Sequence, residues 1–203
     1  MRQINRQSTP KVTDGKVQKK NNPEWTANYY DTPPSALVID RQRPGKGYRH
    51  FLLQRDIETF IGLLPDWAEL SQGLNAIVMA PGQGRYFGYH SPGVVHICAW
   101  KDDLWLRYRG NEVGLEKNLS IYRRLAVPCE PDEDGRISCK FDSTTVRAFQ
   151  LLDVLLHELG HHHDRLTTKS KVRASRGEPY AEAYALRYEA AIWERYQEAF
   201  GGW

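Results

Sequence analysis

The segment Leu151–His163 reads LLDVLLHELGHHH and joins an apolar helical pattern to four histidines, the last three of them consecutive. Apolar residues recur with the spacing of an amphipathic helix at Val146, Phe149, Leu152, Leu155, Leu156 and Leu159. Asp142 or Ser143 precedes this pattern and can cap the first turn. The sequence therefore predicts a helix that begins near residue 143 and carries the histidines in its second half.

Within that segment, His157-Glu158-Leu159-Gly160-His161 is an HExxH motif. Side chains four residues apart lie on the same face of a helix, so His157 and His161 can reach one metal ion. Glu158 follows the first ligand directly and can take a proton from water held at that ion. The motif predicts one Zn²⁺ per chain with Glu158 as general base, although other divalent ions fit such ligands. A histidine-rich surface helix is the alternative interpretation.

A catalytic zinc site needs a third protein ligand, and the downstream carboxylates supply the choices. Glu178, Glu182 and Glu189 lie four and seven residues apart, on one face of a second predicted helix that runs to about residue 200. Pro179 is suited to be the first residue of that helix. We expect Glu182 to be the ligand, because its direction is fixed within the helix and the alanines around it permit close packing. Glu178 is the next alternative. It ranks second because its position directly before Pro179 also fits a helix cap with no role as a ligand.

The HELGH motif followed by Glu182-Ala183-Tyr184-Ala185-Leu186 resembles zincin metallopeptidases of the gluzincin type, and is most similar to the minimal-gluzincin and ImmA/IrrE-like proteins. The resemblance covers about residues 143–200. Thr167 occupies the place where metzincins carry their third histidine, which disfavours that class. The resemblance implies an α+β, zincin-like fold, in which a small mixed or antiparallel sheet packs against the HExxH helix and a C-terminal glutamate-bearing helix. It also implies hydrolysis of peptide bonds in a protein or peptide substrate.

In such folds an exposed sheet edge pairs with the extended substrate. The segment 93–100 is the most β-prone before the motif, so we expect Val95, His96 and Ile97 to contact the substrate; a buried central strand is the alternative. Tyr184 is the expected electrophile for the oxyanion, although tyrosines on such helices more often serve packing. Asp153 precedes the first motif histidine by four residues and can orient its second ring nitrogen.

The rest of the chain predicts one domain over residues 35–203 and an extended or flexible basic arm over residues 1–34. Strands are expected at 36–39, 75–79, 86–89, 93–100, 104–108 and 137–141, and a helix over 54–70 that Pro65 interrupts. Asp102-Asp103 is the predicted hairpin turn between 93–100 and 104–108. Residues 119–127 fit either a helix or a strand. Trp25, Tyr29 and Tyr30 are the residues through which the arm can dock on the domain.

Composition and charge restrict the classes of partner. The 203 residues are 40% hydrophobic and 26% charged, and no apolar run is long enough for a membrane span. Residues 1–24 contain six basic and two acidic side chains and so have a net charge of +4. Because the whole chain has a net charge of +3, the remaining residues have a net charge of −1. A nucleic-acid partner is therefore disfavoured except through this arm.

Cysteine use and the N-terminal sequence bear on the compartment. The first 20 residues lack the apolar core of a secretory signal, which predicts a cytoplasmic protein. Three cysteines in such a chain favour reduced thiols, although Cys129 and Cys139 flank a turn-like stretch and can form a bridge.

Three functions are compatible with these patterns. The leading hypothesis is a zinc-dependent endopeptidase. The second is a non-catalytic zinc-binding interaction or regulatory module of zincin fold. The third is a peptidase kept silent by its own N-terminal arm.

Overall fold

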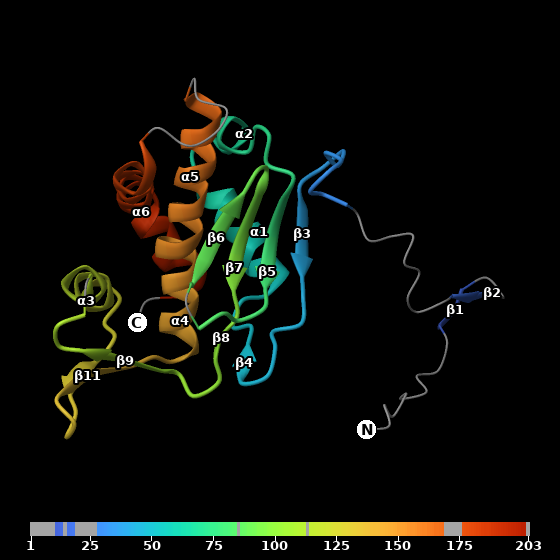
Figure 1. Ribbon diagram of the computed structural model, residues 1–203. Helices are drawn as coiled ribbons and strands as arrows, with labels where there is room; N and C mark the ends of the chain where they lie inside the picture. Colours follow the sequence, from blue (N-terminus) through green and yellow to red (C-terminus); the bar gives the residue numbers. More distant parts are fainter. Residues whose placement is uncertain are drawn as a thin grey trace.

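The chain has an α+β architecture built around a four-stranded sheet (Figure 1). The computed structural model describes residues 28–84, 86–112, 114–168 and 176–201, together with the backbone of two short strands, β1 (Lys11–Thr13) and β2 (Lys16–Gln18), which pair with each other. The predicted contact of Trp25 lies outside the described residues. Among those residues, no helix has the length and apolar character needed to cross a membrane.

The central sheet is mixed, with strand order β3-β5-β7-β6. Its strands are β3 (Val38–Arg41), β5 (Ala76–Ala80), β7 (Val94–Cys98) and β6 (Gly88–Ser91). The first three run parallel, whereas β6 pairs antiparallel with β7, with Tyr89 opposite His96. The edge of the sheet nearest the motif helix is therefore β6. This corrects the expectation that 93–100 forms the exposed edge, because β7 lies between two partners.

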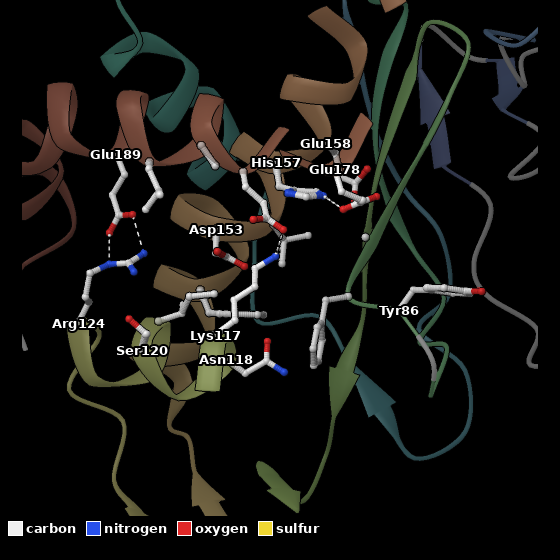
Figure 2. A pocket seen from close by; sticks show the side chains of 18 residues that line it. Tyr86, Lys117, Asn118, Ser120, Arg124, Asp153, His157, Glu158, Glu178 and Glu189 are labelled. Atoms are coloured by element: carbon white, nitrogen blue, oxygen red, sulfur yellow. Dashed lines mark hydrogen bonds and ion pairs between the residues drawn. The ribbon is translucent and has the colours of Figure 1, made fainter. Parts of the chain in front are cut away.

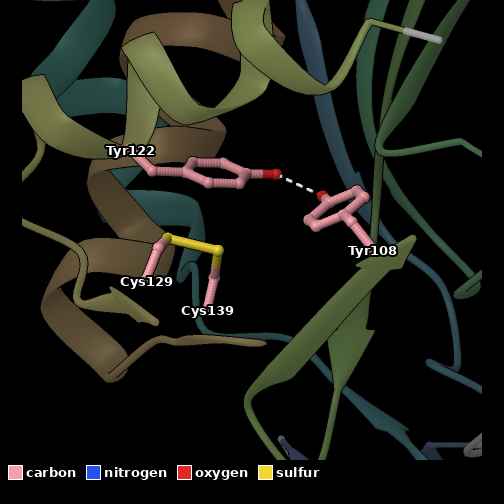
Figure 3. The surroundings of a disulfide bond; sticks show 4 residues. All are labelled: Tyr108, Tyr122, Cys129 and Cys139. Carbon is pink, nitrogen blue, oxygen red and sulfur yellow. Dashed lines mark hydrogen bonds between the residues drawn. A yellow bond between two sulfur atoms is a disulfide. The ribbon is translucent and has the colours of Figure 1, made fainter. Parts of the chain in front are cut away.

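The remaining strands form two smaller sheets. β4 (Tyr48–Arg49) pairs with β8 (Trp100–Lys101), and β9 (Trp105–Arg109), β10 (Cys129–Pro131) and β11 (Arg136–Lys140) form a sheet of order β10-β11-β9. The predicted hairpin at Asp102-Asp103 is wrong, since β9 pairs with β11 rather than with the strand before it. Cys129 and Cys139 are register partners and form a disulfide, so the expectation of reduced thiols does not hold for them (Figure 3). Beside this bond the hydroxyls of Tyr108 and Tyr122 are 2.6 Å apart.

The helices lie near the predicted ranges with two differences: a helix that begins at Leu115 occupies most of 119–127, which the sequence left open between helix and strand, and the final helix begins earlier than expected. They are α1 (Gln54–Leu63), α2 (Trp67–Leu70), α3 (Leu115–Arg124), α4 (Ser143–Ala148), the π-helical segment Phe149–Leu155, α5 (Leu156–Thr167) and α6 (Gly177–Phe200). Asp142 caps α4 by accepting hydrogen bonds from the backbone of Thr144 and Thr145, as predicted. The final helix begins two residues before Pro179, which places Glu178 in its first turn.

The two faces of the central sheet are covered differently. Ile77 and Met79 belong to the main core, which extends from Leu52 to Tyr196 and includes the helices. The alternate residues on β5 face a smaller cluster that Tyr29 covers. Tyr29 is buried, and its hydroxyl donates to Asp40 at 2.8 Å. The C-terminal end of the predicted arm is thus packed on the sheet.

Close packing of α5 against α6 sets the position of the site. A Cβ added at Gly160 would lie 2.8 Å from the Cα of Ala181, so the two helix backbones approach at a distance that only glycine permits. Ala181 and Ala185 are buried in the same interface. Figure 1 shows α5 between α6 and the edge strand β6.

Candidate metal centre

The motif histidines lie at the start of α5, directly after the π-helical segment. The Nε2 atoms of His157 and His161 are 3.0 Å apart, and both rings are largely buried. Two nitrogens bound tetrahedrally at zinc distances are about 3.3 Å apart, so the rings already converge on one point. Burial lowers the pKa of His157, and the neighbouring His161 ring lowers it further. A neutral imidazole is the form that binds a metal.

The third residue at this point is Glu178. Its two carboxylate oxygens lie 3.2 Å from Nε2 of His157 and 3.2 Å from Nε2 of His161. In the described part of the chain, these three residues form the group of side chains able to hold one metal ion. Two imidazoles and a carboxylate match the chemistry of a zinc site with an open position.

Glu182, the expected third ligand, lies elsewhere. Its carboxylate pairs with the ammonium of Lys117 on α3. The physical reason is the packing of α6 on α5: the close contact of Gly160 with the backbone of Ala181 places the first turn of α6, rather than its second, beside the histidines. The structure thus replaces Glu182 with Glu178 as the residue placed for ligation, and Figure 2 shows Glu178 beside His157.

Glu158 is buried between the motif helix and the edge strand. The place where a Cβ of Gly88 would lie is 3.1 Å from Cγ of Glu158, so β6 packs directly on this side chain. Burial, together with the smaller effect of the charges of Glu178 and Asp153, raises the pKa of the Glu158 carboxyl to about 8. A cation held by the three ligands would oppose these effects and favour the ionised form.

Two cavities open beside this group. One, of about 440 Å³, lies along β6 and is lined by Tyr86, Gly88, Tyr89, His90, Arg165 and the four motif and ligand residues. Burial, together with the smaller effect of the nearby His162 and His161, lowers the pKa of His90 to about 3, so this ring is neutral near pH 7. A polypeptide lying along β6 would therefore pass Glu158 and the convergent ligands.

The second cavity, of about 430 Å³, lies between α3, α6 and the π-helical segment (Figure 2). Two ion pairs join the helices that form its walls. Lys117 contacts Glu182, and the guanidinium of Arg124 donates to both oxygens of Glu189 at 3.2 and 2.8 Å. Asp153 lies between them, and burial raises the pKa of its carboxyl to about 6.

No match was found. A search against protein-family models, curated proteins and solved structures gave no protein similar to this chain. The interpretation of the site consequently rests on its residues and their arrangement.

Two other residues singled out from the sequence, Tyr184 and Asp153, make no described contact that supports the roles predicted for them. Tyr184 is buried against the rings of His163 and Tyr188, at centroid distances of 5.4 and 4.6 Å, and lines neither of the two cavities. It therefore packs α6 and does not face the expected oxyanion. No hydrogen bond between described residues joins Asp153 to His157, so the predicted orienting role has no contact to support it.

The predicted substrate-contacting strand is also internal. Val95, His96 and Ile97 are buried, and His96 is held by the hydroxyl of Tyr30 at 2.9 Å and the carbonyl of Tyr89 at 3.2 Å. The position of β6 at the edge could not be predicted from its sequence, because Gly-Tyr-His-Ser has little of the alternating pattern of a strand. In the structure its four residues are half-buried.

The contribution of α3 to the site was not predicted. A signal was available: Lys117 and Arg124 are seven residues apart, as are their partners Glu182 and Glu189. Equal spacing of opposite charges on two helices is expected when the helices lie side by side.

Proposed function

We propose that this chain is a zinc-dependent peptidase of the gluzincin type, with His157, His161 and Glu178 as ligands and Glu158 as general base. The observation that carries the proposal is the convergence of three ligand side chains, each within hydrogen-bond distance of the other two, next to the buried carboxyl of Glu158. Bound zinc would supply Lewis acidity and an activated water at the open position.

The remaining steps belong to the protein. Glu158 accepts a proton from the attacking water and passes it to the amine nitrogen of the leaving peptide. β6 pairs with β7 on one side. Its other side adjoins the cavity that contains the ligands, so we propose that an extended substrate adds to the sheet there. The peptide carbonyl would then lie over the metal position, within reach of Glu158.

We do not propose a cytoplasmic location, because the disulfide between Cys129 and Cys139 favours an oxidising compartment. The described part of the arm, residues 28–34, contacts the sheet through Tyr29 and Tyr30 and lines neither of the two cavities, so this part gives no support to the hypothesis of a silenced peptidase.

The test is cleavage of a proteome-derived peptide library by the zinc-loaded protein, with new termini identified by mass spectrometry. Cleavage is expected to stop on chelation and to return with zinc. One bound zinc without any new termini would refute peptidase activity and favour the non-catalytic zinc module.

A further inference from the structure

The cavity between α3 and α6 adjoins the proposed ligands and has the size of a side-chain subsite. Its volume of about 430 Å³ falls within the range of roughly 300–1,000 Å³ typical of ligand pockets. His157, Glu158 and Glu178 form one end of it. A residue of the substrate next to the cleaved bond would therefore project its side chain into this space.

The charges that face the cavity do not cancel. Lys117 is paired with Glu182, and Arg124 with Glu189. Glu158 and Glu178 face the proposed metal position and would be offset by its charge of +2. Asp153 is the acid that is left: Lys117 and Arg124 lie close enough to lower the pKa of its carboxyl, against the larger opposite effect of burial, but among the described residues neither makes a hydrogen bond or ion pair with it.

The walls of the cavity suit an aliphatic chain that ends in a positive charge. Phe87, Ile121, Phe149, Val154 and Leu186 supply apolar surface. Lysine and arginine place their methylene groups on such surface while the charged end meets a carboxylate or an aromatic face. A purely apolar side chain would instead leave Asp153 buried without a partner, which is costly.

We propose that this cavity selects a lysine or arginine side chain of the substrate and that Asp153 binds its charged end. This inference rests on the proposed peptidase function. It makes Asp153 a specificity-determining residue rather than a support for His157. Asp153 lies near the middle of the cavity in Figure 2, between the Arg124–Glu189 pair and His157.

The first test is the residue preference around the cleaved bonds in the peptide library, for the parent and for Asp153→Asn. The parent is expected to favour lysine or arginine at one position. Asparagine keeps the shape and removes the charge, so kcat/KM for a lysine peptide should fall about tenfold to a hundredfold, the usual effect of losing a hydrogen bond between charged groups. A peptide with leucine at that position should change by less than about threefold.

Controls separate selection from structural damage. Glu194→Gln removes an exposed acid from the outer part of α6 and is expected to leave the preference unchanged. Zinc content is measured for every variant. An equal loss on both peptides, a loss of zinc in Asp153→Asn, or a parent that shows no basic preference would each overturn the proposal.

A binding measurement keeps this proposal distinct from the catalytic one. Calorimetry on zinc-loaded Glu158→Gln compares the affinities of the lysine and leucine peptides, both uncleaved. A lysine preference that Asp153→Asn abolishes would support the subsite even if the parent cleaves nothing. Equal affinities would refute the subsite even if the parent is an active peptidase.

Discussion

Replacing Glu178 with alanine is expected to weaken zinc binding by about a hundredfold, whereas the same change at Glu182 should weaken it by less than about fivefold. Structural zinc sites with four ligands bind with about 10–16 kcal/mol, or roughly 3 kcal/mol for each ligand, and each 1.36 kcal/mol is a factor of ten. Both oxygens of Glu178 lie 3.2 Å from a motif imidazole, so it should contribute a full share.

Glu182 makes an ion pair with Lys117 and does not contact the motif histidines. The two side chains are 40% and 50% exposed, and an exposed pair of this kind contributes about 0.2–1 kcal/mol. The assay is competition for zinc between each variant and a chromogenic chelator, with circular dichroism to confirm folding. Tight zinc binding by Glu178→Ala together with weak binding by Glu182→Ala would refute the ligand assignment.

Three further predictions concern stability. Gly160→Ala should lower the free energy of unfolding by about 1–3 kcal/mol, because its Cβ would meet the backbone of Ala181. Gly62→Ala is the control: no heavy atom lies within 4 Å of the place where its Cβ would be, so the change should be neutral or stabilising by up to about 1 kcal/mol. Similar urea midpoints for the two would contradict this. Asp142→Ala should cost about 1 kcal/mol through loss of the cap, and an unchanged midpoint would count against the observed capping bonds. In metal-free protein the pKa of Glu158 is raised from 4.5 to about 8, so the unfolded chain releases this proton at lower pH than the folded protein does, and the parent loses stability as pH rises from 4.5 to about 8. Glu158→Gln has no such proton and should therefore become more stable relative to the parent over this range. A difference in unfolding free energy that does not change with pH would argue against burial of Glu158.

The helices around the site could be predicted from local sequence because their signals are local. The cap at Asp142, the apolar spacing that follows it and the break at Pro65 all act within a few residues. The start of α6 could not be placed from Pro179 alone, since proline is tolerated throughout the first turn. The turn of α6 that lies beside the histidines depends on the tertiary contact of Gly160 with Ala181, which brings Glu178 rather than Glu182 to them.

Tertiary arrangement accounts for the other differences. Strand order decides which segment is the edge, and the β-rich 93–100 became an internal strand because β6 folds back on it. The disulfide likewise depends on the register of β10 and β11, which brings Cys129 opposite Cys139. Tyr184 faces the packed side of α6, where helix crossing rather than spacing determines its neighbours.

The most direct test of the central claim compares peptide hydrolysis by the parent and by Glu158→Gln, each with its zinc content measured. Glutamine fills the same buried space beside β6 but cannot accept the proton. We expect one zinc per chain in both proteins and a loss of nearly all turnover in the variant, by at least about a hundredfold. Undiminished hydrolysis by the zinc-loaded variant would contradict the assignment of Glu158 as the general base.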